Sequence, residues 1–244
     1  MKTYGLIGKN IDYSFSKSYF NTKFNNEAIK AKYINYDIDD IKEIKQIVGN
    51  SIELAGLNVT IPYKEKVIPF LDEIDSQAER IGAVNTIKIE NKKLIGYNTD
   101  VFGFTKSIFS LIAPNHEAAL ILGTGGAAKA VRHALVSMGY QINFVSRDKD
   151  KGDFTYEDLN AEVINSHQLI VNCTPLGTHP DVNQCPPIPF EFINEAHLLY
   201  DLIYNPSITS FLAQGKEKGA QIINGEQMLI AQAEKAWDIW NEED

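Results

Sequence analysis

Residues 118–128 read AALILGTGGAA, a pattern typical of one class of α/β protein. The apolar run at 118–122 predicts a buried strand, and a helix is expected over 127–138 after the glycine-rich turn. Gly123 permits the tight bend, and Gly125 lets the backbone approach a pyrophosphate, which would sit on the free N–H groups at the start of the helix. A bare glycine turn is the alternative interpretation, but the flanking strand and helix favour a dinucleotide site.

The end of the next expected strand, 141–147, predicts which dinucleotide is bound. An NAD enzyme places Asp or Glu about 20 residues after the glycine turn, where it holds the ribose 2′-hydroxyl. This chain has Ser146 and Arg147 instead. A guanidinium pairs bidentately with a phosphate, so these residues suit a 2′-phosphate and predict NADP as cofactor. An ordinary surface arginine is the alternative, and the adjacent Asp148 weakens the positive field.

On both sides of this motif, apolar runs of strand length alternate with stretches of helical period. Strands are expected at 3–8, 32–38, 54–60, 118–123, 141–147, 167–174 and 197–204, with a hairpin or two edge strands formed by 83–89 and 93–97. Helices are expected at 17–29, 40–48, 63–71, 101–112, 127–138 and 226–241. The alternation predicts an α/β protein with βαβ units and a mostly parallel sheet.

Composition excludes several classes of protein. The chain has 244 residues, 44% of them hydrophobic and 23% charged, as in soluble globular proteins. A net charge of −9 gives no general electrostatic reason to bind nucleic acid or an anionic membrane. Cys173 and Cys185 form neither a CxxC metal pair nor a disulfide framework. With no signal peptide and no long apolar run, a cytoplasmic location and no metal are expected.

Polar residues gather where strands of the first half end. Ser14 and Ser16 follow the first strand, and Thr60 and Lys64 lie at and after the end of the third; Asn85 lies near the start of the hairpin and Asp100 just after it. In an open α/β sheet, ligands bind at the carboxyl ends of the strands. Each residue also has a plain alternative: a helix N-cap for the serines or Asp100, and a solvated surface cation for Lys64.

A series of motifs in this order resembles the shikimate dehydrogenase family, from about residue 5 to residue 232. They are 58–64 (NVTIPYK), 82–86 (GAVNT), 96–100 (GYNTD), 123–128 (GTGGAA), 172–175 (NCTP), 201–206 (DLIYNP) and 225–232 (GEQMLIAQ). The resemblance implies two α/β domains with a cleft between them. Residues 1–100, completed by 226–244, would bind substrate, and 101–225 would form a Rossmann-like NADP-binding domain.

The implied reaction is the reversible, NADPH-dependent reduction of 3-dehydroshikimate to shikimate in aromatic amino acid biosynthesis. By resemblance, Lys64 is the general acid/base and Asp100 lies beside it. Implied substrate contacts are Ser14, Ser16, Thr60, Lys64, Asn85, Asp100, Tyr204 and Gln232. Implied cofactor contacts are Gly123, Gly125, Gly126, Ala127, Ser146, Arg147, Asn172, Thr174, Leu202 and Gly225.

The first motif departs from the family pattern HSxSPxxHN, because residues 13–21 read YSFSKSYFN. Both serines are kept, while Tyr13, Lys17 and Phe20 replace His, Pro and His. Three other functions stay open: a quinate/shikimate dehydrogenase that also uses NAD, a methylenetetrahydrofolate dehydrogenase on a similar plan, and a non-catalytic sensor of NADP or shikimate. The paired serines and the NTD motif speak against the second, and retention of Lys64 and Asp100 speaks against the third. A monomer or homodimer is expected.

Overall fold

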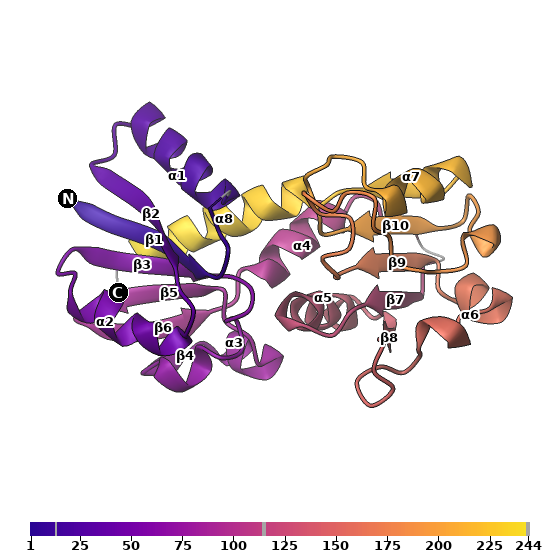
Figure 1. The fold of residues 1–244 in the computed structure, drawn as a ribbon, viewed down its shortest axis with the longest axis horizontal. Helices are drawn as coiled ribbons and strands as arrows, with labels where there is room; N and C mark the ends of the chain where they lie inside the picture. Colours follow the sequence, from indigo (N-terminus) through magenta and orange to yellow (C-terminus); the bar gives the residue numbers. More distant parts are fainter. Residues whose placement is uncertain (13, 114–115, 243–244) are drawn as a thin grey trace. The chain divides into compact units, whose positions relative to one another are not determined.

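The computed structural model describes residues 1–12, 14–113 and 116–242. The chain forms two compact units: unit 1 comprises Met1–Thr99 with Ala233–Asp244, and unit 2 comprises Asp100–Gln232. Helix α8 (Glu226–Asn241) therefore contributes its first part to unit 2 and its last part to unit 1. Each unit has its own sheet (Figure 1).

Unit 1 contains a mixed six-stranded sheet with the order β2-β1-β3-β5-β6-β4. Its strands are β1 (Lys2–Gly8), β2 (Ala31–Asp37), β3 (Leu54–Val59), β4 (Glu73–Ile74), β5 (Thr86–Glu90) and β6 (Lys93–Tyr97). Strand β1 is parallel to β2 and β3, and β4 is parallel to β6, whereas β5 runs antiparallel to both β3 and β6. The predicted hairpin is confirmed, with Asn91 and Lys92 both at positive φ in its turn.

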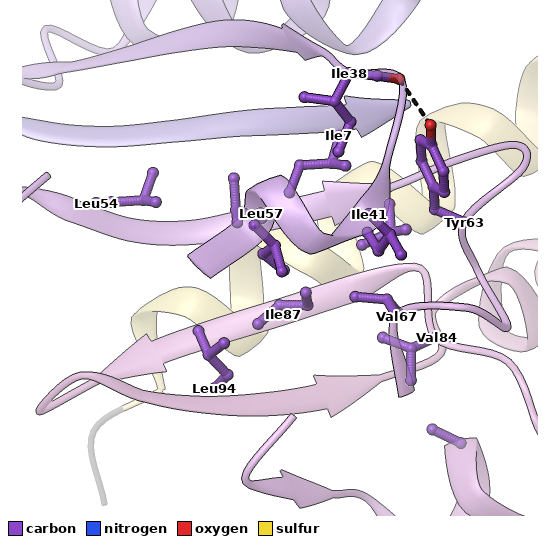
Figure 2. Packing of buried hydrophobic residues seen from close by; sticks show 13 residues of the cluster. Ile7, Ile38, Ile41, Leu54, Leu57, Tyr63, Val67, Val84, Ile87 and Leu94 are labelled. Carbon is purple, nitrogen blue, oxygen red and sulfur yellow. Dashed lines mark hydrogen bonds between the residues drawn. The ribbon is translucent and has the colours of Figure 1, made fainter. Parts of the chain in front are cut away.

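Helices cover both faces of this sheet. The helical segments are α1 (Phe15–Asn26), η1 (Ile41–Glu43), α2 (Ile44–Gly49), η2 (Ile68–Phe70), α3 (Ser76–Ile81) and the end of α8. Alternation along β1 places Tyr4 in a core with α1 and α8, and Ile7 in a second core with α2 and α3. Figure 2 shows this second core around Leu57 and Ile87.

Unit 2 contains a five-stranded sheet with the order β11-β10-β9-β7-β8, and every pairing described in it is parallel. Its strands are β7 (Ala118–Leu122), β8 (Gln141–Val145), β9 (Leu169–Asn172), β10 (Leu198–Asp201) and β11 (Gln221–Ile223). The strands are mostly apolar, and the central strands β7, β9 and β10 are almost entirely buried, because both faces of the sheet are covered. This is the predicted Rossmann-like α/β fold, with the glycine turn directly after β7.

The helical segments of unit 2 are α4 (Asp100–Ile108), α5 (Gly126–Ser137), η3 (Tyr156–Asp158), α6 (Ala161–Ser166), η4 (Phe190–Phe192), α7 (Ser210–Glu217) and the start of α8. Ile164 of α6 and Phe211 of α7 pack with Leu120 on one face of the sheet. Phe104 of α4 contacts Tyr200 of β10, with ring centroids 4.9 Å apart. Within the described ranges, no helix combines the length and apolar character needed to cross a bilayer.

Several predicted helices have different bounds. The helix predicted over 17–29 is α1, which begins earlier because Ser14 caps it. The helix predicted over 101–112 ends at Ile108. The helix predicted over 63–71 is wrong: turns and the short η2 segment stand there, because Pro62 and Pro69 lack the N–H group that a continuous helix needs.

Candidate active site

The two predicted carboxylate-binding serines lie at the start of α1. Ser14 is the N-cap, and its Oγ accepts a hydrogen bond from the Lys17 N–H at 3.3 Å. This bond uses an oxygen lone pair, while a serine hydroxyl also carries a proton that it can donate. Ser16 is buried and hydrogen-bonds the phenol of Tyr33. Ser14 therefore combines its capping role with a donor suited to an anion. Tyr13, where the motif departs from the family, lies outside the described residues.

The loop after β3 carries Thr60 and Lys64, and the core holds this loop in place. Tyr63 is buried and donates from its phenol to the main-chain oxygen of Ile38 at 2.7 Å (Figure 2). Val67, one turn further on, is fully buried in the same core. The main-chain oxygen of Lys64 accepts from the Val84 N–H at 2.8 Å. The backbone of Lys64 is thus held by its own hydrogen bond and by the buried residues Tyr63 and Val67 on either side, while the residue itself is only half-buried.

A buried polar network joins three of the predicted motifs in unit 1. Asn58 accepts from the Tyr33 hydroxyl at 2.7 Å and donates to Thr86 Oγ1 at 3.2 Å. The Asn85 side-chain oxygen accepts from the Thr99 N–H at 2.7 Å, and its amide donates to Thr99 Oγ1 at 3.0 Å. Because Ser16 also bonds to Tyr33, the network extends from α1 to the end of β6. Sequence reasoning missed Tyr33, since its role depends on contacts distant in sequence.

In unit 2, the glycine turn fits the phosphates of a dinucleotide. Gly123 has φ +102, a conformation that glycine adopts readily. Gly125 is the N-cap of α5 and supplies no capping side chain. The first N–H groups of a helix lack intrahelical acceptors, so they attract anions. A Cβ added at Gly125 would meet nothing within 4 Å, so space beside the turn is open to a phosphate group.

The residues predicted to select NADP follow β8. Ser146 is buried, and its hydroxyl accepts from the Asp148 N–H at 3.1 Å. Arg147 is exposed. Its positive charge lowers the pKa of the nearby Tyr156, whereas burial raises that pKa and is the larger effect. Lys151 pairs with Asp148 at 2.9 Å, so its charge is partly neutralised. Arg147 is therefore an exposed cation beside Ser146, with Tyr156 as a neighbour that sequence reasoning missed.

The ends of β9 and β10 bring Asn172, Thr174 and Asp201 together. The Asn172 amide donates to Asp201 at 3.0 Å, and its oxygen accepts from the Thr174 hydroxyl at 2.7 Å. A Cβ added to Gly123 would lie 3.3 Å from Thr174 Cγ2, so this loop lies against the glycine turn. The predicted cofactor residues Gly123, Asn172 and Thr174 thus form one cluster.

The predicted substrate-binding residues of unit 2 lie on three segments. Asp100 is the first residue of α4 and is buried. Tyr204 follows β10, and burial raises its pKa. Gln232 on α8 is buried, and its amide donates to the Leu229 main-chain oxygen at 2.8 Å.

Two predicted cofactor residues, Leu202 and Gly225, touch through their backbones. A Cβ added at Gly225 would lie 2.0 Å from the Leu202 main-chain oxygen. The Gly225 N–H also donates to the Ile203 oxygen at 3.1 Å. Residue 225 must therefore be a glycine, because any side chain would collide with the backbone at Leu202.

Comparisons with known proteins agree with this geometry. Residues 6–87 match the family described as "Shikimate dehydrogenase substrate binding domain". A "Shikimate dehydrogenase (NADP(+))" of Clostridium botulinum is 42% identical over 98% of this chain and 96% of its own length.

Solved structures show the same likeness. A shikimate dehydrogenase from Aquifex aeolicus matches with a TM-score of 0.88 and 36% identity, covering 99% of this chain and 92% of that one. The shikimate 5-dehydrogenase of Thermus thermophilus, solved "in complex with NADP(H) and shikimate", matches with a TM-score of 0.87 and 28% identity, covering 99% of this chain and 91% of that one.

Proposed function

The chain belongs to the shikimate dehydrogenase family, and from this premise we propose that it catalyses the reversible, NADP-dependent reduction of 3-dehydroshikimate to shikimate in aromatic amino acid biosynthesis. The observation that carries the proposal is the 42% identity to an NADP-dependent relative across nearly the whole of both chains. The buried network of Asn58, Asn85 and Thr99 supports it, because residues of separate family motifs meet there. We propose that the enzyme works in the cytoplasm as a monomer or homodimer.

When bound, NADP supplies the hydride chemistry, and the protein contributes binding, orientation and one proton. Lys64 is proposed as the general acid/base for the oxygen at the reacting carbon. Its anchored backbone supports this role, because proton transfer requires the ammonium at hydrogen-bond reach of the reacting oxygen. Asp100 is proposed to accept a hydrogen bond from a ring hydroxyl and to hold the lysine in position.

The substrate carboxylate is proposed to bind Ser14 and Ser16 at the start of α1. A helix N-terminus and serine hydroxyls favour an anion without needing a full positive charge. The substrate's remaining polar groups are proposed to bind Thr60, Asn85, Tyr204 and Gln232. In this proposal, residues 1–100 and 226–244 bind substrate.

Residues 101–225 are proposed to bind NADP. Gly123, Gly125, Gly126 and Ala127 would hold the pyrophosphate at the start of α5. Ser146 and Arg147 would hold the 2′-phosphate. The remaining proposed contacts are Asn172, Thr174, Leu202 and Gly225.

The test is the absorbance of reduced nicotinamide with purified protein, using shikimate or quinate with NADP⁺ or NAD⁺. Formation of NADPH with shikimate and NADP⁺ alone is the expected result. Equal rates with quinate or NAD⁺ would instead identify a dual-specificity quinate/shikimate dehydrogenase. If the folded protein reduces neither cofactor with either substrate, the proposed activity is overturned and a sensor of NADP or shikimate is favoured.

A further inference from the structure

A carboxylate that the proposed reaction does not use lies at the end of β10. Asp201, its neighbour Asn172 and Thr209 each have 0% exposure. Asp201 and Asn172 are register partners at the carboxyl ends of adjacent parallel strands. Ligands of an open parallel sheet bind at that edge. A buried charge there needs a structural or functional reason, because burying one is costly.

Three neutral donors satisfy this carboxylate. One oxygen accepts from the Asn172 amide and from the Ile203 N–H, both at 3.0 Å. The other oxygen accepts from the Thr209 hydroxyl at 2.6 Å. An ionised carboxylate is an acceptor only, so it matches a site made of donors.

Asp201 thereby fixes the orientation of the Asn172 amide. With the Asn172 nitrogen turned toward Asp201, its oxygen accepts from the Thr174 N–H at 3.0 Å and from the Thr174 hydroxyl at 2.7 Å. The Thr174 oxygen in turn accepts from the Leu176 N–H at 3.3 Å. The turn over 172–176 therefore depends on which way the Asn172 amide faces.

This turn lies against the glycine turn. The Cys173 N–H donates to the Leu122 main-chain oxygen at 2.9 Å, immediately before Gly123. A Cβ at Gly123 would lie 3.3 Å from Thr174 Cγ2 and 3.4 Å from the Cys173 main-chain oxygen. A shift of the 172–176 turn would thus change the packing around Gly123.

We propose that Asp201 is a positioning residue for the dinucleotide: its carboxylate sets the Asn172 amide, and through it the 172–176 turn beside Gly123. The ligand in this inference rests on the proposed function. In this proposal Asp201 does not touch the cofactor and acts on it through Asn172 and the turn. Its loss therefore weakens NADPH binding and leaves the binding of shikimate alone unchanged.

The test is Asp201→Asn, measured by NADPH fluorescence titration and by calorimetric titration with shikimate. The variant keeps the shape of the side chain but places an NH₂ group among donors. A neutral amide accepts more weakly than a carboxylate, so the hold on the Asn172 amide loosens and the Kd for NADPH is expected to rise about tenfold or more. Asp72→Asn is the matched control: it removes the same charge from a carboxylate that accepts the Leu94 N–H in unit 1, and NADPH binding should not change.

A second variant separates positioning from folding. In Asp201→Asn with Asn172→Asp, the new amide at 201 can donate to the new carboxylate at 172, whose other oxygen can still accept from Thr174, while the Ile203 N–H loses its acceptor. The double variant is therefore expected to recover part of the lost NADPH affinity. Equal losses of NADPH and shikimate affinity, or no recovery in the double variant, would overturn the positioning role.

The two hypotheses fail differently. Wild-type protein that binds no NADPH would refute the proposed function. Wild-type protein that binds NADPH, with Asp201→Asn binding it equally well, would refute the positioning role alone.

Discussion

The indole of Trp240 lies directly against the backbone of Gly56, so that a Cβ added to Gly56 would stand 2.3 Å from the indole nitrogen. The same nitrogen donates to the main-chain oxygen of Ile87 at 3.0 Å. Residue 240 on α8 thus closes over β3 and β5, near the middle of the unit 1 sheet.

Gly56→Ala is expected to destabilise the protein by about 1–3 kcal/mol, because the added methyl overpacks the contact with Trp240. Urea unfolding followed by tryptophan fluorescence measures the loss. Gly49→Ala is the control, since a Cβ there meets nothing within 4 Å and should leave stability equal or slightly higher. Equal effects of the two substitutions would contradict the proposed packing.

Tyr33→Phe is expected to cost about 1–3 kcal/mol, because the Asn58 side-chain oxygen loses its buried donor. Tyr4→Phe provides a matched control. The Tyr4 hydroxyl lies in the same aromatic core and has no hydrogen-bond partner among the described residues, so its removal should be neutral or stabilising. Denaturant midpoints compare the two variants, and an equal loss in both would argue against the network.

Lys64→Ala is expected to lower kcat by about 10²–10⁴-fold, the usual contribution of a general acid/base. The Kd for NADPH should stay unchanged, because the substitution removes a proton donor and not a cofactor contact. Lys66→Ala, on the exposed side of the same loop, is the control. Near-normal turnover of Lys64→Ala, with the wild-type dependence on pH, would rule out the proposed role.

Arg147→Ala is expected to raise the Kd for NADPH about tenfold or more, because a charge-assisted bond to the 2′-phosphate is lost. Affinity for NADH should stay the same, since NADH carries no such phosphate. Fluorescence titration with both cofactors measures the ratio, and Arg132→Ala on the exposed face of α5 should leave that ratio unchanged. A parallel loss of NADH affinity would mean that Arg147 does not discriminate between the cofactors.

Asp201 gives a prediction for stability against pH. Burial raises its pKa from 3.8 to about 6, opposed by its bonds to Thr209, Ile203 and Asn172. Between these two values the unfolded chain releases a proton that the folded chain keeps, so this group's contribution to stability falls as pH rises through the window. The full change is about 3 kcal/mol.

Urea unfolding of wild type and Asp201→Asn from pH 4.5 to 7.5 isolates this contribution. Wild-type stability minus variant stability should decrease as pH rises. Cys185 and Tyr200 interact electrostatically with Asp201, and burial raises the pKa of each, so both stay neutral throughout. A difference that is constant across this range would show that Asp201 does not titrate there.

Most of the fold follows from patterns local in the sequence. Apolar runs such as 118–122 form strands where expected, because a strand whose two faces are both buried needs apolar side chains at successive positions. The helix predicted over 63–71 failed because Tyr63, Val67 and Phe70 have helical spacing, yet Pro69 prevents a regular helix. Helix α3 was not predicted, since so short a helix buries only Ala78 and Ile81 and depends on its caps, Asp75 and Gly82.

The candidate site was predictable where residue type and position sufficed, as for the glycine turn after β7. It was not predictable where function depends on partners distant in sequence. The Ser16 contact with Tyr33 requires α1 to pack on β2, and the Asp201 bond to Asn172 spans the β9–β10 pairing. Neither pairing has a local signature, because many polar residues end strands without meeting one another.

The division of α8 between the two units has a consequence for how the protein is made. A ribosome delivers all of unit 2 as one continuous segment, whereas unit 1 lacks Ala233, Ala236 and Trp240 until the last turns of α8 emerge. Since domains begin to fold during synthesis, unit 1 is synthesised first but can complete its folding only after all of unit 2 has been made. A stop codon between Gln232 and Trp240 would leave unit 2 whole and unit 1 without part of its core, exposing aromatic surface to chaperones and proteases.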